Sequence, residues 1–148
     1  EPIKLHNVFE ALCEFYEEVA AEKPVQFSIT GKASIHGDKL MLQRAFGNLL
    51  ENAIRHSHTN GTINIKIKTV NSATNIVIEN TGDNITPEQL PRLFDRFYRA
   101  DSSRQRNDEG AGLGLAITQS IITAHAGNIS VCSDNGVTKF DILFTKTS

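Results

Sequence analysis

The sequence predicts an α+β fold in which helices cover one face of a mixed β-sheet. Apolar residues recur at helical spacing in three long segments, whereas shorter segments alternate apolar and polar residues. The short strands are joined by hairpin turns and interleave with the helices, which favours one layer of helices against the sheet. The predicted helices are 5–21, 39–56 and 113–126. The predicted strands are 25–30, 62–70, 75–80, 129–133 and 139–144.

Length and composition indicate one ordinary globular domain over 1–148, without internal repeats or a linker. The 15 basic and 17 acidic residues give a net charge of −2, so nucleic acid is not an expected partner. Cys13 and Cys132 lack metal-ligand spacing, and their apolar surroundings predict two buried thiols in a reducing compartment. No apolar run approaches membrane-spanning length and the start is unlike a signal peptide, so we expect a cytoplasmic location.

The first predicted helix, 5–21, has one apolar face. The residues on that face are Leu5, Val8, Phe9, Leu12, Phe15, Tyr16 and Val19. The strand at 25–30 follows, and a Gly-Lys-Ala turn separates it from the second helix. Asp38 is a favourable N-cap, so we expect that helix over 39–56, where Leu, Phe and Ala residues again share a face.

Asn60-Gly61 is a turn signal between the second helix and the alternating strand at 62–70. The strand at 75–80 pairs with it through a hairpin-like loop at 71–74. Pro87 then marks the start of another helical segment, because proline is favoured in the first turn of a helix. The middle of the chain is therefore expected to be an antiparallel strand pair followed by a helix.

Residues 101–112 are polar, charged and glycine-containing, and they form the one long loop that the sequence predicts. The third long helix, 113–126, is amphipathic, and Gly127 is the residue expected to end it. The last two strands form a hairpin around the Asp-Asn-Gly turn at 134–136.

Asn48 and Asn52 lie four residues apart on one face of the second helix. Asparagine is a poor helix former, and two amide oxygens on one ridge suit a hard cation such as Mg²⁺, which would in turn bring phosphates. From the spacing alone, two polar groups at the edge of a packed face explain the pair equally well. Arg55 and His56 add hydrogen-bond donors one turn later, whereas Glu51 is better explained as a solvated helix residue than as a base.

Gly110, Gly112 and Gly114 immediately precede or begin the third helix. Such a run either lets the backbone approach phosphates or forms a flexible joint, and it cannot by itself distinguish the two. The start of a helix offers free amides and a positive dipole end, and Arg99 lies just upstream. Together with the asparagine pair, these features indicate a polyphosphate ligand. The sequence has no GxxxxGK[ST] motif, so it is not a P-loop protein.

Four segments of the chain, in order, resemble the sequence boxes of sensor histidine kinases. NLLENAIRHS at 48–57 resembles the N box, ENTGDNI at 79–85 the first glycine box, LFDRFYRAD at 93–101 the F box, and EGAGLGLAI at 109–117 the second glycine box. The resemblance covers essentially the whole chain and is to the catalytic ATP-binding domain. Through LPRLFDRFYRADSSRQR it is most similar to the copper- and silver-type heavy-metal sensors.

This resemblance implies a two-layer α/β sandwich of the Bergerat kind, with ATP held between helices under a flexible lid. It implies that Asn52 is the Mg²⁺ ligand, that Asn48 supports it, and that Arg99 lies near the γ-phosphate. The other residues that it implies at the nucleotide are Arg55, His56, Asn80, Gly82, Tyr98, Gly110, Gly112, Leu113 and Gly114.

The first glycine box departs from the D-x-G-x-G pattern of the family. Asn80 stands in place of the aspartate that accepts a hydrogen bond from the adenine amino group, and Asn84 in place of the second glycine. Strand alternation places Asn80 on the same face as Ile76 and Ile78, so we expect it to be at least half-buried. A neutral acceptor forms a weaker bond than a carboxylate, which predicts weaker adenine binding.

The resemblance also implies the partners. The γ-phosphoryl group would pass to a histidine on a separate dimerisation domain and then to a response regulator, in an inner-membrane homodimer that responds to metal ions. This chain alone is expected to be monomeric. It contains no H-[ED]-x-x-x-P sequence, and neither His6 nor His125 fits an acceptor, so we expect that it does not autophosphorylate alone.

Two other readings stay open. An ATPase of the same fold, as in gyrase, carries a glutamate four residues before the metal-binding asparagine, and here Asn48 occupies that place. A degenerate interaction module without nucleotide is suggested by Asn80 and Asn84, although the N box and the lid glycines argue against it. Phosphate release and nucleotide binding would separate the three.

Overall fold

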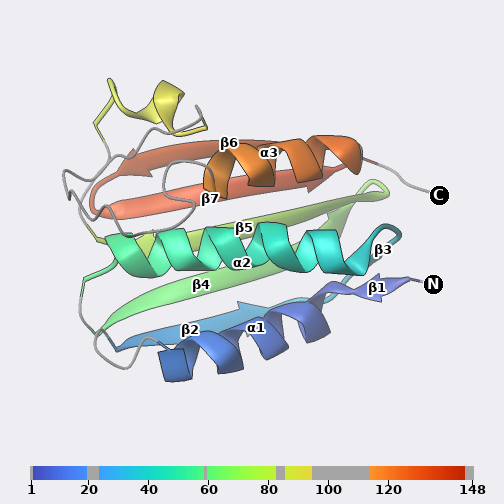
Figure 1. Cartoon of the computed structure of the whole chain (residues 1–148), viewed down its shortest axis with the longest axis horizontal. Coiled ribbons are helices and arrows are strands. Elements are labelled where there is room, and N and C mark those ends of the chain that lie inside the picture. The colour runs from blue at the N-terminus through green and yellow to red at the C-terminus, as the bar shows by residue number, and fades with distance from the viewer. Residues whose placement is uncertain (1, 20–23, 59, 83–85, 95–113, 146–148) are drawn as a thin grey trace.

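Figure 1 shows the computed structural model of the chain, which describes residues 2–19, 24–58, 60–82, 86–94 and 114–145. The first elements are β1 (Ile3–Lys4), α1 (Leu5–Val19), β2 (Val25–Thr30), β3 (Ser34–Ile35) and α2 (Lys39–His56). The central elements are β4 (Gly61–Val70), β5 (Ala73–Thr81) and the 3₁₀ helix η1 (Leu90–Arg92). The last elements are α3 (Gly114–Ala124), β6 (Gly127–Asp134) and β7 (Val137–Phe144).

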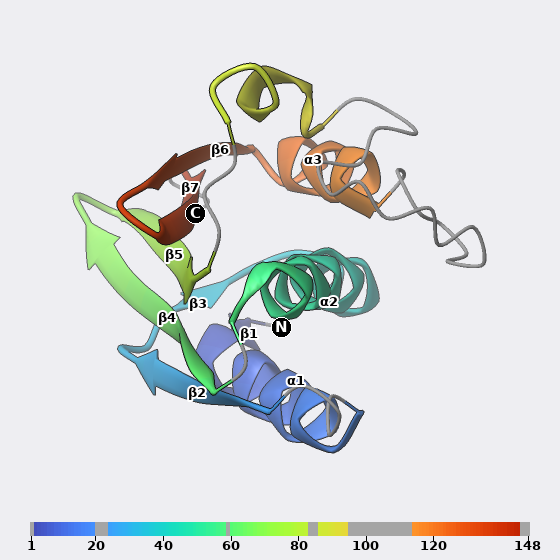
Figure 2. The same cartoon turned by 90° about the vertical axis from the view of Figure 1, so that its left-hand side faces the viewer.

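The main sheet has five strands in the order β2-β4-β5-β7-β6. The β2–β4 pair is parallel, whereas the other three pairs are antiparallel, so the sheet is mixed. The helices α1, α2 and α3 all lie on the same side of this sheet, as the end-on view in Figure 2 shows. The predicted α+β sandwich with helices on one face is confirmed.

The second helix begins and ends where the sequence predicts. The Asp38 side chain accepts a hydrogen bond of 3.1 Å from the Met41 amide, which satisfies one of the free N–H groups in the first turn. One face of α2 is then buried from Leu42 to Ala53. Within the part of the chain that the structure describes, no helix combines the length and apolarity needed to cross a membrane.

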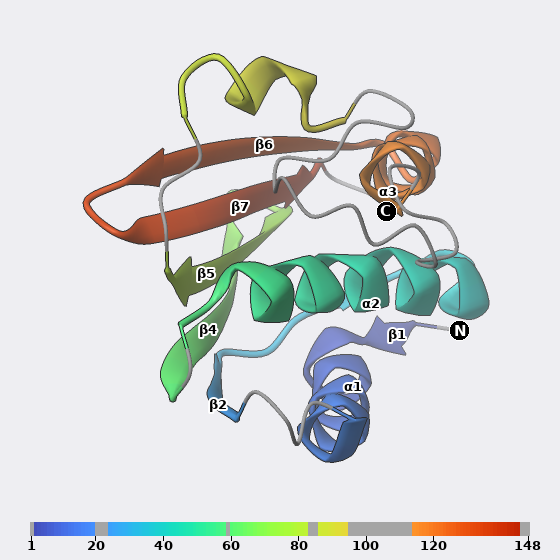
Figure 3. The same ribbon diagram turned by 60° about the vertical axis from the view of Figure 1, so that its left-hand side comes forward.

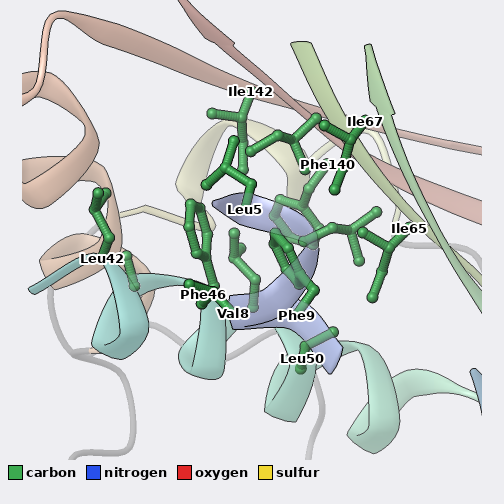
Figure 4. Packing of buried hydrophobic residues seen from close by; sticks show 14 of the residues in the cluster. Leu5, Val8, Phe9, Leu42, Phe46, Leu50, Ile65, Ile67, Phe140 and Ile142 are labelled. Carbon is green, nitrogen blue, oxygen red and sulfur yellow. The ribbon is translucent and has the colours of Figure 1, made fainter. Parts of the chain in front are cut away.

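The hydrophobic core fills the space between the helices and the sheet. Phe9 of α1 and Phe46 of α2 lie with ring centroids 4.7 Å apart, and both are fully buried. Ile65 and Ile67 of β4 and Phe140 of β7 close the core from the sheet side (Figure 4). Burying side chains of this size stabilises the fold by about 1.5–3 kcal/mol each.

The β4–β5 hairpin confirms the predicted strand pair and extends it. The predicted loop at 71–74 shrinks to a two-residue turn, in which Asn71 and Ser72 take positive φ angles of 51° and 69°. Such primed turns match the twist of the flanking strands, so pairing continues up to Val70 and Ala73.

The end of the third helix was predicted incorrectly. The helix stops at Ala124, and Ala126, not a glycine, takes the left-handed conformation with φ 62°. Gly127 is instead the first residue of β6. A Cβ atom there would lie 2.8 Å from Cδ1 of Phe144, so the glycine is required by packing against β7.

The two cysteines differ, although the sequence predicts both to be buried. Cys13 is buried on α1, where burial, with help from Glu17 and Glu10, raises the pKa of its thiol to about 12. Cys132 is exposed on β6. Its strand alternates, and Cys132 falls on the side that faces away from the helices. The prediction is therefore wrong for Cys132.

Two further differences concern short elements. The strands β1 and β3 form a two-stranded antiparallel sheet that the sequence does not predict. Within the described residues 86–94, the helical segment expected after Pro87 forms the 3₁₀ turn η1, and the rest of that predicted segment lies outside the described residues. The predicted loop at 101–112 lies outside the described residues.

Candidate functional site

The predicted site residues that the structure describes gather where the C-terminal half of α2, the start of α3 and the end of β5 meet. Figure 3 shows α2 running between α1 and α3, and α2 packs against both α3 and β5. Ser57, just after α2, forms an isolated bridge with Gly82, just after β5. The Gly82 amide also donates a 2.9 Å hydrogen bond to the carbonyl of Gly136 in the β6–β7 turn. The end of α2, the end of β5 and the β6–β7 turn are distant in sequence and are thus joined at one end of the strands.

Asn48 connects α2 to the first residue of α3. Its side chain is half-buried, and its Nδ2 donates a hydrogen bond of 3.2 Å to the carbonyl of Gly114. A Cβ atom on Gly114 would lie 3.8 Å from Cγ of Asn48, which is an ordinary contact. The packing of the described chain therefore leaves room for a side chain at this glycine.

Asn52 lies one turn after Asn48 and is only 8% exposed. No described residue gives its side-chain amide a hydrogen bond. The Asn52 amide is not among the described side-chain groups that are buried without a hydrogen-bond partner, so its polar atoms keep contact with solvent, where a ligand can reach them. An amide oxygen is a suitable ligand for Mg²⁺. Across the described ranges, no three His, Cys, Asp or Glu side chains gather where they could hold a metal ion.

Arg55 and His56 occupy the last turn of α2, with Arg55 exposed and His56 half-buried. Basic groups are favourable there because the carbonyl end of a helix carries a partial negative charge. Their role as donors to a phosphate stays a prediction.

Gly82 is required by the packing of the chain itself. A Cβ atom at this position would lie 1.9 Å from the carbonyl oxygen of His56 and 3.2 Å from Cα of Ser57. Both contacts are with backbone, which cannot move aside without shifting the end of α2. The glycine therefore allows β5 to end directly against α2, whatever it also does at a nucleotide.

Asn80 is 2% exposed and faces the helices, as the alternation of its strand predicts. It pairs with Thr138 in the β5–β7 register, and Thr138 is also 2% exposed. The Thr138 hydroxyl lies 2.9 Å from the hydroxyl of Ser133 on β6. These two hydroxyls were not predicted at the site. The available signal was that Thr138 shares the alternating face of β7 with Phe140 and Ile142.

Glu51 turns away from the asparagine ridge. Its carboxylate accepts a 3.0 Å hydrogen bond from the hydroxyl of Tyr16 on α1, and it is exposed. Burial, and secondly the charge of Glu51, raise the pKa of Tyr16. The interpretation of Glu51 as a solvated helix residue is confirmed, and the structure adds that it links α2 to α1.

Several predicted site residues are outside the described part of the chain. These are Tyr98, Arg99, Gly110, Gly112 and Leu113, and the same holds for Asn84. Their roles at a nucleotide stay predictions.

Comparison with known proteins places this chain in a family. Residues 37–148 match the sequence profile described as "Histidine kinase-, DNA gyrase B-, and HSP90-like ATPase". The chain is 48% identical over 130 residues to the sensor histidine kinase CusS of Escherichia coli K12, covering 87% of the chain and 27% of CusS. It is 49% identical over 106 residues to the probable sensor kinase SilS of Salmonella typhimurium, covering 72% of the chain and 21% of SilS.

A solved structure agrees with both. The mycobacterial sensor histidine kinase MprB superimposes with a TM-score of 0.85 at 26% identity, covering 97% of each chain. The curated relatives are longer, and the chain spans about a quarter of the length of CusS and SilS. The predicted resemblance to the catalytic domain of sensor histidine kinases is thus confirmed in sequence and in fold. The chain belongs to the family of histidine kinase-, DNA gyrase B- and HSP90-like ATPases.

Proposed function

We propose that this chain binds Mg²⁺ and ATP between α2 and the start of α3, and donates the γ-phosphoryl group of ATP to a histidine on a separate dimerisation domain. The observation that carries the proposal is Asn52, a nearly buried amide to which no described residue gives a hydrogen bond. Its place one turn from Asn48, which holds the start of α3, gives an external ligand two elements to bind at once.

The described residues have separate roles in this proposal. Asn52 offers its amide oxygen to the metal, and Asn48 positions the first turn of α3 through the Gly114 carbonyl. The free amides of that turn face phosphate oxygens. Asn80, on the side of β5 that faces the helices, contacts the adenine. When bound, Mg²⁺ neutralises phosphate charge, which phosphoryl transfer needs together with alignment.

The partners follow from the kind of protein that this chain resembles. The sequence has no H-[ED]-x-x-x-P segment, so the acceptor histidine would lie on another domain. A response regulator would then receive the phosphoryl group. We infer that the parent protein is an inner-membrane homodimer that responds to metal ions, with this domain, monomeric by itself, on the cytoplasmic side.

Calorimetry with ADP tests the binding site. Wild type is expected to bind ADP more tightly with Mg²⁺ than without it. Asn52→Ala should weaken binding with Mg²⁺ by about tenfold or more, because it removes the oxygen ligand. Asn128→Ala is the matched control, since Asn128 is exposed on the opposite face of the sheet. Equal affinities in the wild type and Asn52→Ala would contradict the assignment of the metal ligand.

Labelled ATP tests the transfer reaction. The chain and ATP carrying a labelled γ-phosphate are incubated with and without a purified dimerisation domain of a sensor histidine kinase. Acid-labile label is expected on the dimerisation domain and not on the chain alone. Label on the chain alone would refute the need for a second domain, whereas steady release of phosphate would favour the ATPase reading.

A further inference from the structure

One row of the sheet changes from apolar to polar at the candidate site. Adjacent strands place Phe27, Ile63, Asn80, Thr138 and Ser133 opposite one another across all five strands. The first two are apolar, and the last three carry an amide and two hydroxyls on the side that faces the helices. Asn80 and Thr138 are each 2% exposed, whereas Ser133 on the edge strand β6 is half-buried.

The three polar groups of this row share one chemical property. Each can donate and accept hydrogen bonds, and none carries a charge. A carboxylate in the place of Asn80 would only accept. The hydroxyls of Thr138 and Ser133 lie 2.9 Å apart, and either oxygen can be the donor of the hydrogen bond between them.

The Asn80 amide is weakly held. Its Nδ2 donates to the carbonyl of the adjacent residue, Thr81, over 3.4 Å. Protein N–H···O bonds are usually about 2.7–3.2 Å long, so this bond contributes little to the orientation of the amide. The amide can therefore turn so that either its oxygen or its nitrogen meets a ligand.

Purine bases differ in which atoms of the edge at position 6 donate and which accept hydrogen bonds. The 6-amino group of adenine donates beside an accepting N1, whereas the 6-oxo group of guanine or hypoxanthine accepts beside a donating N1. A carboxylate facing position 6 suits the first edge and repels the second. An amide suits both, because turning it exchanges its donor and its acceptor.

We propose that Asn80, with Thr138 and Ser133, lets this site accept 6-oxo purine nucleotides as well as adenine nucleotides. The inference rests on the proposed function, because it assumes that the base of a nucleotide faces this row. It makes Asn80 a specificity-determining residue. The residue that weakens adenine recognition also relaxes the choice of base.

Competition calorimetry with ADP, IDP and GDP, all with Mg²⁺, tests this inference. IDP has the 6-oxo edge without the 2-amino group, so it separates hydrogen bonding at position 6 from steric exclusion of guanine. In the wild type, IDP is expected to bind within about tenfold of ADP. In Asn80→Asp, ADP should bind more tightly and IDP more weakly, so that the ratio of the two dissociation constants rises by about tenfold or more.

Two further variants complete the experiment. Asn80→Ser keeps a neutral group that both donates and accepts, so its ratio should match that of the wild type. Asn128→Asp adds the same charge on the exposed face of the sheet and should leave the ratio unchanged. If Asn80→Asp does not fold, the wild-type ratio and Asn80→Ser still decide.

The outcomes separate this inference from the function on which it rests. A wild type that binds ADP but rejects IDP by about a hundredfold or more overturns the inference and leaves the proposed function intact. An unchanged ratio in a folded Asn80→Asp also overturns it. A wild type that binds none of the three nucleotides refutes the proposed function itself.

Discussion

The helices α2 and α3 are joined by a hydrogen bond at each end of α3, and the two ends differ. Where α3 ends, the ring of His125 accepts a 3.1 Å hydrogen bond at Nε2 from the Asp38 amide. Where α3 begins, Asn48 donates to the Gly114 carbonyl over 3.2 Å. The two bonds are similar in length, but their surroundings are not.

The His125 end is complete within the protein. Its Nδ1 lies 2.8 Å from the Ile121 carbonyl, and since Nε2 accepts, Nδ1 carries the proton and donates. Gly37 leaves the space that the ring occupies, because a Cβ atom there would lie 2.4 Å from Cδ2 of His125. At the Asn48 end, Asn52 is nearly buried and finds no partner among the described residues. The His125 end is thus held by the protein alone, whereas the Asn48 end is where the proposed function places the ligand.

The largest loss of stability is expected from Gly82→Ala. This substitution tests whether the region of the candidate site also contains rigid packing. The new Cβ atom would meet the His56 carbonyl at 1.9 Å, so the end of α2 must shift. We expect a loss of about 3 kcal/mol in the free energy of unfolding, because backbone cannot move aside cheaply. Urea unfolding followed by circular dichroism measures it.

Gly114→Ala is the matched control for this substitution. The new Cβ atom at Gly114 makes an ordinary 3.8 Å contact, and alanine is a better helix former than glycine. The free energy of unfolding should therefore change by less than about 1 kcal/mol. Equal losses in the two variants would contradict the view that, of these two glycines, only Gly82 is required by packing.

The next largest loss of stability is expected at the end of α3 that His125 holds. His125→Ala removes two hydrogen bonds and is expected to lower the free energy of unfolding by about 1–2 kcal/mol. Gly37→Ala should cost about 1–3 kcal/mol in the wild type, since the ring must move, but little in His125→Ala, where the ring is absent. A double-mutant cycle by urea unfolding measures this coupling. Additive losses, or a weakened affinity for ADP in either variant, would contradict a purely structural role.

Asn48→Ala should reduce the affinity for ADP more than the stability, in contrast to His125→Ala. The Asn48 side chain is half-buried, so its loss is expected to lower the free energy of unfolding by no more than about 1 kcal/mol. Affinity for ADP with Mg²⁺ should fall by about tenfold, because the first turn of α3 is no longer held at the phosphates. Calorimetry and unfolding of the same preparation test both. Stability that falls while affinity stays constant would make Asn48 a packing residue only.

The fold was predictable wherever the signals are local. The helix at 39–56 was predicted with the bounds of α2, because a capping aspartate and an apolar face are both visible in the sequence. The strands β1 and β3 were missed because two residues cannot show a period. The end of α3 was missed because the requirement at Gly127 comes from Phe144 on another strand.

The sequence was sufficient to predict which residues belong to the candidate site, but not which of them are in contact. Asn48 and Gly114 were both predicted, but the hydrogen bond between them joins positions 66 residues apart. Thr138 was missed because alternation with Phe140 and Ile142 places it on the inner face, but only the register of β5 and β7 places it beside Asn80. The residues that a sequence identifies as polar acquire a role only when the sheet brings them into one row.

The smallest loss of stability is expected from changes in the contact between α1 and α2, which lies at neither end of α3. Tyr16→Phe removes the hydrogen bond to Glu51 but keeps the ring, and because Glu51 is exposed, the loss should be about 0.5–1 kcal/mol in the free energy of unfolding. Glu51→Gln should have an effect of similar size or less, since an amide oxygen still accepts. Neither change should alter the affinity for ADP or the transfer of phosphate by more than about twofold, because Glu51 faces α1. A fall of about tenfold in phosphate transfer or release in Glu51→Gln, with Tyr16→Phe unaffected, would return Glu51 to the role of a base.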